Sequence, residues 1–127
     1  MSLPIGTELE TQKLKLELRL KQLERVETCH DEFIPFVKSM WPEFIAGRHH
    51  YIIAEKLEQI ARGEIKRLII NMPPRHTKSE FASYLFPAWM IGRNPAMKII
   101  QATHTTELAV NFGRKVENLL ETEEYQE

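Results

Sequence analysis

Residues 67–80 read Arg-Leu-Ile-Ile-Asn-Met-Pro-Pro-Arg-His-Thr-Lys-Ser-Glu, and the expected fold is organised around them. The stretch opens with a short apolar run, residues 68–70, which has the length and composition of a buried strand. Pro73 and Pro74 exclude a helix and remove two backbone donors, so the run must end in a rigid loop. Residues 80–91 are compatible with a helix. We therefore predict a strand, a tight loop and a helix.

Lys78 and Ser79 stand at the end of this loop, immediately before the predicted helix. The layout is that of a phosphate-binding P-loop (Walker A motif). There, loop N–H groups and a helix N-terminus face an anion, a lysine supplies positive charge, and a hydroxyl holds Mg²⁺. The match to G-x-x-x-x-G-K-[ST] is incomplete, because Met72 and Thr77 replace its two glycines. The alternative interpretation is a proline-stiffened surface loop whose lysine and arginine are merely solvated.

Residues 71–80, together with a second apolar segment that ends in Ala102-Thr103-His104-Thr105, resemble the N-terminal ATPase region of large terminase subunits. These subunits are the DNA-packaging motors of tailed bacteriophages. The family often writes the loop as Pro-Pro-Arg-His-Gly-Lys-Ser, with a basic residue early in the loop, as Arg75 is here. The resemblance extends over about residues 44–120.

The resemblance implies ATP and Mg²⁺ as cofactors and assigns roles to the loop. Lys78 would contact the β- and γ-phosphates, Ser79 would hold the Mg²⁺, and Arg75 would add charge near the γ-phosphate; Lys78 and Arg75 are thus the expected catalytic residues. The expected nucleotide-binding residues are Pro74, Arg75, His76, Thr77, Lys78 and Ser79.

The family also implies partners and a place in the cell. In the intact motor, ATP hydrolysis would drive double-stranded DNA into the capsid, with a small terminase subunit and the portal protein as partners. The location would be the cytoplasm of the infected bacterial cell, at the procapsid.

Composition limits the remaining possibilities. The chain has 127 residues, enough for one small domain with a core, and a formal net charge of -1, so any basic surface for nucleic acid must be local. The single cysteine, Cys29, excludes an internal disulfide and fits a reducing intracellular compartment. No apolar run approaches the roughly 18 residues that a membrane span needs.

Residues 7–30 contain no proline or glycine and predict a long helix. At about 100° per residue, four leucines fall on one side and two nearly opposite. The first set is Leu9, Leu16, Leu20 and Leu23, and the second is Leu14 and Leu18. Such a helix packs on the rest of its own domain or contacts another subunit, including a copy of itself. We favour the first interpretation, because the leucine spacing does not sustain the heptads of a coiled coil.

The rest of the chain completes the expected architecture. Residues 31–47 are rich in aromatic side chains and predict short helical pieces around a core, and residues 49–62 predict an amphipathic helix that stops at Gly63. Pro87 should kink or split the helix after the loop. Residues 97–102 predict a second strand, and Thr105 is the natural N-cap of a helix over residues 106–121.

Strand, helix and strand over about 35 residues form a βαβ unit with parallel strands. The expected fold class is therefore α/β: a helical N-terminal region followed by a P-loop-type βαβ unit, in an incomplete parallel-sheet NTPase domain. Residues 1–30 would form a helical extension, and residues 31–127 the N-terminal portion of a P-loop ATPase domain.

A P-loop ATPase also needs an acidic Mg²⁺ ligand at the end of another strand. No segment after Ser79 has that pattern, and the nuclease half of a terminase is absent too. We therefore expect the chain to continue beyond residue 127, and residues 1–127 alone to be inactive. The alternatives are another P-loop motor of helicase type and a non-catalytic helical interaction module.

Overall fold

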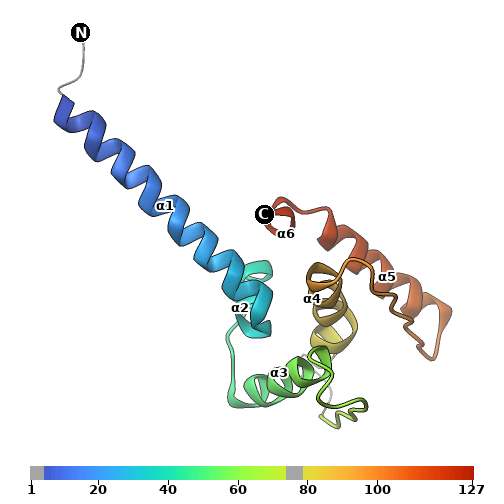
Figure 1. Ribbon diagram of the computed structural model, residues 1–127. Coiled ribbons are helices and arrows are strands. Elements are labelled where there is room, and N and C mark those ends of the chain that lie inside the picture. The colour runs from blue at the N-terminus through green and yellow to red at the C-terminus, as the bar shows by residue number, and fades with distance from the viewer. Residues whose placement is uncertain (1–4, 74–78) are drawn as a thin grey trace.

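The computed structural model describes residues 5–73 and 79–127, and helices dominate this part of the chain (Figure 1). The elements in chain order are α1 (Ile5–Asp31), α2 (Phe33–Met40), α3 (Arg48–Ala61), the π-helix η1 (Glu80–Leu85), α4 (Phe86–Arg93), α5 (Thr106–Leu120) and α6 (Glu123–Gln126). The body is formed by α2 to α5 with α6 beside α2, while α1 extends away from it.

The predicted α/β fold class is wrong. Neither residues 68–70 nor residues 97–102 form a strand, and within the described ranges there is no sheet and hence no βαβ unit. The helix between them does form, as η1 followed by α4. The described residues of the predicted ATPase portion are therefore mostly helical.

The first predicted strand shows why the pattern misled. Leu68, Ile70 and Met72 pack against the core, whereas Ile69 between them is 85% exposed. The alternation expected of extended backbone is therefore present. A strand also needs a neighbour for its backbone hydrogen bonds, and no such bond joins this segment to residues 97–102 among the described residues. Ile100 in that second segment is 97% exposed.

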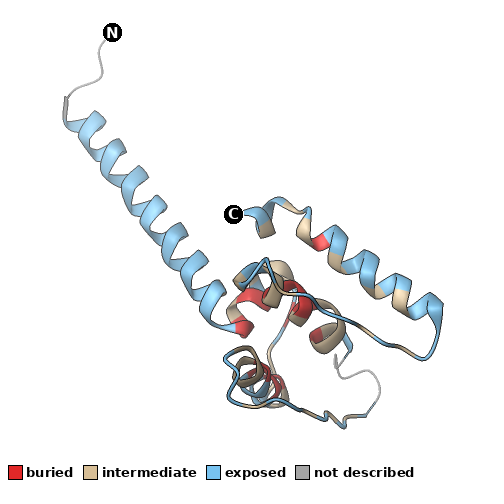
Figure 2. Cartoon of the chain, turned by 45° about the vertical axis from the view of Figure 1, so that its right-hand side comes forward, coloured by how far each residue is buried: buried red, intermediate tan, exposed pale blue. Residues whose placement is uncertain are grey.

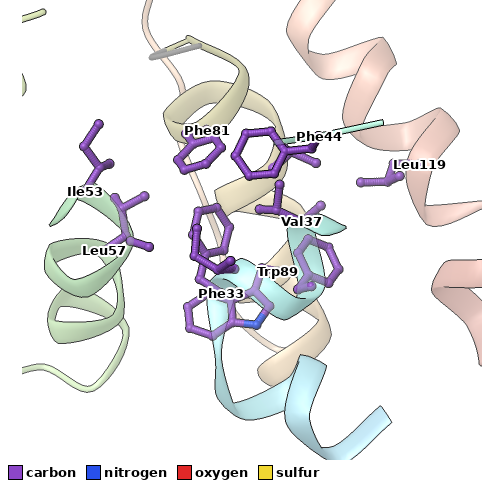
Figure 3. Close-up of a cluster of buried hydrophobic side chains, with 13 residues drawn as sticks. Phe33, Val37, Phe44, Ile53, Leu57, Phe81, Trp89 and Leu119 are labelled. Carbon is purple, nitrogen blue, oxygen red and sulfur yellow. The ribbon is translucent and has the colours of Figure 1, made fainter. Parts of the chain in front are cut away.

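The core is built around one phenylalanine. Phe33, at the start of α2, is 0% exposed, and its ring centroid lies 5.4 Å from those of Phe81 and Trp89 and 5.9 Å from that of Phe86 (Figure 3). These rings come from α2, η1 and α4, so one side chain joins three helices. Aromatic pairs at such separations stabilise by roughly 0.5–1.5 kcal/mol beyond their burial. The predicted aromatic core in residues 31–47 is confirmed.

Helix α3 closes the core from another side. The helix expected at residues 49–62 is confirmed at Arg48–Ala61, with Ile53 and Leu57 buried. Gly63 follows with φ 77°, the left-handed conformation common just past a helix end. Glu58 Oε1 accepts a hydrogen bond from the backbone N–H of Phe33 at 2.9 Å, so α3 supplies the acceptor that the first N–H of α2 needs.

Helix α1 does not pack as we favoured. All six of its leucines are 57–69% exposed, and most of its length lies away from the body (Figure 2). Its last turns make the contacts with α2 and α4. There, Cys29 O accepts a hydrogen bond from Trp89 Nε1 at 2.9 Å, and Arg25 Nη2 donates to Ser39 Oγ at 2.5 Å. The prediction that the leucines pack on the same domain is therefore wrong.

We predict that Phe33→Ala lowers the free energy of unfolding by about 3–5 kcal/mol, because it empties the site where three helices meet. Phe33→Leu, which keeps most of the volume, should fall between Phe33→Ala and the wild type. Urea unfolding followed by tryptophan fluorescence measures the change. The control is Ile45→Ala, whose side chain is 87% exposed, and it should stay within about 0.5 kcal/mol. Equal effects of Phe33→Ala and Ile45→Ala would contradict the arrangement.

Candidate phosphate-binding loop

The structure describes one of the six predicted loop residues. Pro74, Arg75, His76, Thr77 and Lys78 lie outside the described residues. Ser79, the predicted Mg²⁺ ligand, has helical backbone angles, φ -68° and ψ -37°, and stands immediately before η1 with its side chain exposed. The predicted hydroxyl thus belongs to a residue with helical backbone and is open to solvent.

The described residues on either side of the loop are anchored in the core. On the N-terminal side, Met72 packs against the core cluster. On the C-terminal side, Phe81 is 0% exposed, with its ring centroid 5.4 Å from that of Phe44 and 5.1 Å from that of His50. The helix that follows the loop is therefore held in place by its first buried side chain.

The helix opens in a π-helical conformation over Glu80–Leu85, and the N–H of Phe86 donates to the carbonyl of Phe81 five residues back. The change to the regular α4 comes at Phe86–Pro87. Pro87 has no N–H to offer the carbonyl of Ser83 four residues back. The helix that we expected Pro87 to kink or split runs on without a break from η1 into α4, and what changes at this point is the backbone, from π-helical to α-helical. Short π-helical turns of this kind are frequent at functional sites.

A side chain from the second apolar segment replaces the donor that Pro87 lacks. Gln101 Nε2 donates a hydrogen bond to Ser83 O at 2.5 Å. This bond places residues 97–102 beside η1 although no sheet joins the two segments. Sequence reasoning missed Gln101. The sequence signal was Pro87, because a proline at this position leaves the carbonyl of Ser83 without its usual backbone donor. The signal did not show which residue would supply a donor instead.

The threonine-rich turn after this segment has a structural use. Thr105 Oγ1 accepts a hydrogen bond from the N–H of Leu108 at 3.2 Å, which confirms the predicted N-cap of α5. Thr103 Oγ1 donates to the carbonyl of Thr105 at 2.7 Å. Two of the three hydroxyls therefore hold the turn itself, while His104 is exposed.

Charges near the start of η1 are balanced. Lys115 of α5 lies with its Nζ 3.4 Å from Glu80 Oε1, and the same Nζ is 5.9 Å from the centroid of the Tyr84 ring. Burial, with a smaller contribution from the charge of Glu80, raises the pKa of the Tyr84 hydroxyl. Because Lys115 offsets the carboxylate, an anion at this helix start meets less repulsion than the sequence alone indicates.

The metal-binding capacity of the described residues is small. No group of three or more His, Cys, Asp or Glu side chains gathers in residues 5–73 and 79–127 in a way that could hold a metal ion. Ser79 is the described residue to which the sequence assigns Mg²⁺. Arg75 and Lys78, the predicted catalytic pair, fall in the part of the loop that is not described.

No protein family, curated protein sequence or solved structure matches this chain. The phosphate-binding hypothesis therefore depends on the residues of the loop and on the geometry around Ser79. Among the helices of the described residues, none has both the length and the apolar character to cross a membrane.

We predict that Gln101→Ala lowers the free energy of unfolding by about 1–3 kcal/mol, because the part-buried carbonyl of Ser83 loses its side-chain donor. In a Pro87→Ala background the new backbone N–H is available to that carbonyl, so the same substitution should cost less than half as much. A double-mutant cycle by urea unfolding measures the coupling. Lys98→Ala, on the same segment and exposed, is the control and should have little effect. Additive costs would show that Pro87 and Gln101 do not act on one carbonyl.

Proposed function

We propose that residues 74–79 bind the phosphates of ATP with Mg²⁺, and that this chain is the ATP-binding part of a DNA-packaging motor of the large terminase type. The observation that carries the proposal is the position of the Pro-Pro-Arg-His-Thr-Lys-Ser segment. In the sequence it runs up to Ser79, which has helical backbone angles and stands directly before η1, and η1 is anchored by the buried Phe81. A helix start offers free N–H groups and the positive end of the helix dipole to an anion.

In this proposal each polar residue of the loop has its own chemical role. Lys78 neutralises charge on the β- and γ-phosphates, Ser79 contributes its exposed hydroxyl to Mg²⁺, and Arg75 adds positive charge near the γ-phosphate. The pairing of Glu80 with Lys115 supports the assignment, because the carboxylate nearest the helix start is partly neutralised. The proposal needs loop N–H groups and a helix start, both of which a helical protein can supply.

The wider activity follows from the family resemblance. We propose that ATP hydrolysis in the intact motor moves double-stranded DNA into a capsid, together with a small terminase subunit and a portal protein. The site of action is the cytoplasm of the infected bacterial cell, at the procapsid. Hydrolysis requires an acidic Mg²⁺ ligand and a residue that positions water, and residues 1–127 contain no strand-end acidic pair of the expected pattern.

A second candidate function is a helical interaction module that uses α1. The observation in its favour is the exposure of all six leucines of this helix. Burying such side chains against another protein would be favourable by roughly 1.5–3 kcal/mol for each one fully covered. The two functions are compatible, because most of α1 lies away from η1, the helix that follows the loop in the sequence (Figure 1).

We predict that the chain binds a fluorescent ATP analogue in the presence of Mg²⁺, and that Lys78→Ala raises the Kd at least tenfold by removing the phosphate-facing charge. Ser79→Ala should reduce the part of the affinity that depends on Mg²⁺. The measurement is a fluorescence titration with and without Mg²⁺.

The matched control is Lys66→Ala, which removes an exposed lysine ahead of the loop and should leave the Kd within twofold of the wild type. Equal losses in Lys66→Ala and Lys78→Ala would indicate non-specific attraction of the anion. No binding by the wild-type chain would refute the proposal.

A further inference from the structure

His50, in the first turn of α3, is a buried imidazole that the proposed chemistry of the loop does not use. It is 6% exposed, and its ring centroid lies 4.8 Å from that of Phe44 and 5.1 Å from that of Phe81. Phe44 and Phe81 also contact each other, with their ring centroids 5.4 Å apart (Figure 3). His50 therefore belongs to the cluster of rings that holds the first buried residue of η1.

Two hydrogen bonds between His50 and Gly47 fix the protonation state of the imidazole. The backbone N–H of Gly47 donates to His50 Nδ1 at 2.8 Å, and the backbone N–H of His50 donates to the carbonyl of Gly47 at 3.0 Å. Because a backbone N–H can only donate, Nδ1 is the unprotonated nitrogen of a neutral ring. The imidazole takes the place that Glu or Gln has in a capping box, so the N-terminal cap of α3 requires its neutral form.

The imidazole is closely packed against this cap. A Cβ atom added at Gly47 would come 3.0 Å from Cε1 of His49 and 3.5 Å from Nδ1 of His50. The ring centroids of the two histidines are 3.8 Å apart. A proton at Nδ1 would therefore face the N–H of Gly47 at hydrogen-bond distance, where two donors oppose each other.

The charged groups around His50 do not favour a cation at this position. Arg48 and His49 precede it on α3, Lys38 of α2 reaches Tyr51 of the same helix, and a helix start is the positive end of the helix dipole. The carboxylates on α3 and on the segments beside it are exposed or bound elsewhere: Glu43 and Glu55 are exposed, Glu58 binds the Phe33 N–H, Glu64 pairs with Arg62, and Glu80 pairs with Lys115. Residues 74–78, which lie outside the described residues, include no Asp or Glu. The neighbouring phenyl rings can attract a cation but offer no acceptor for its N–H groups.

We propose that His50 is a pH-sensitive switch at the junction of α3 and η1. Protonation of Nδ1 breaks the bond from Gly47 and releases residues 41–47 and the first turn of α3 from Phe81. A histidine in water takes up this proton at about pH 6.5, so the junction is closed above that pH and opens as the pH falls below it. Since Phe81 anchors η1, the switch acts on the helix that follows the candidate loop in the sequence.

The direction of the effect follows from proton linkage. The closed junction holds the neutral ring, and the open junction accepts the protonated one, so the open form binds more protons. Lowering the pH therefore shifts the equilibrium towards the open form, by up to about tenfold per pH unit for one proton.

Amide hydrogen exchange measured by NMR between about pH 5 and pH 7.5 tests the proposal, with rates corrected for the pH dependence of intrinsic exchange. In the wild type, the protection of the Gly47 amide should fall at least fivefold over this range, in step with protonation of the His50 ring as followed by its Cε1–H chemical shift. Amides in the middle of α5 should keep their protection, which distinguishes local opening from unfolding of the whole chain. His50→Gln supplies an uncharged acceptor for Gly47, as in a capping box, so its Gly47 protection should not change with pH.

The matched control is His104→Gln, which removes an exposed histidine in the turn before α5 and should retain the wild-type fall in Gly47 protection. A Gly47 amide whose protection is independent of pH in the wild type, or a fall that persists in His50→Gln, would overturn the proposal. If His50→Gln does not fold, the wild-type titration decides, because a protonated His50 ring beside a Gly47 amide that stays protected would also refute it. Nucleotide is absent from the experiment, so the result is independent of ATP binding by the loop.

Discussion

The edge and face contacts of the Phe33 ring hold this structure together. The ring touches aromatic side chains from η1 and α4, and the backbone N–H of the same residue is bound by Glu58 of α3. One residue at a helix start therefore joins four helices through its side chain and its main chain. Because the chain reaches Phe33 immediately after α1, the body is organised at the point where the long helix ends. Phe81, the buried residue that anchors the helix after the candidate phosphate-binding loop, is one of the side chains that contact the Phe33 ring.

Much of the helical structure was predictable from sequence, whereas the predicted sheet is absent from the described residues. The amphipathic spacing of Ile53 and Leu57 gave α3, and Thr105 gave the start of α5, because both signals act over a few neighbouring residues. The alternation at residues 68–72 correctly reported which side chains face the core. It did not report a strand, because pairing depends on a partner segment elsewhere in the chain. Alternating burial is evidence of extended backbone and does not by itself establish a ladder.

The candidate site was predictable to a smaller degree. The helix predicted over residues 80–91 is present as η1 and α4, and the change from π-helical to α-helical backbone comes at Phe86, next to Pro87. The contacts that support this region come from distant positions. Gln101 binds Ser83 O, and Lys115 pairs with Glu80, at separations of 18 and 35 residues. Lys115 reaches Glu80 because α5 packs beside η1, whereas Gln101 reaches Ser83 from the segment before α5, and no local sequence pattern contains either contact. The prediction that the leucines of α1 pack on the same domain failed for a related reason. Leucine spacing shows which side chains share a face of the helix, but it does not show whether another part of the chain covers that face.

Cys29, the one cysteine of the chain, lies where α1 meets the body. Its carbonyl binds the indole of Trp89, and burial raises the pKa of its thiol, so the reactive thiolate is scarce while the helix is docked. Detachment of α1 would expose the thiol to water and return it to ordinary reactivity. An alkylating reagent should therefore modify this sulfur faster when α1 is undocked than when it is docked.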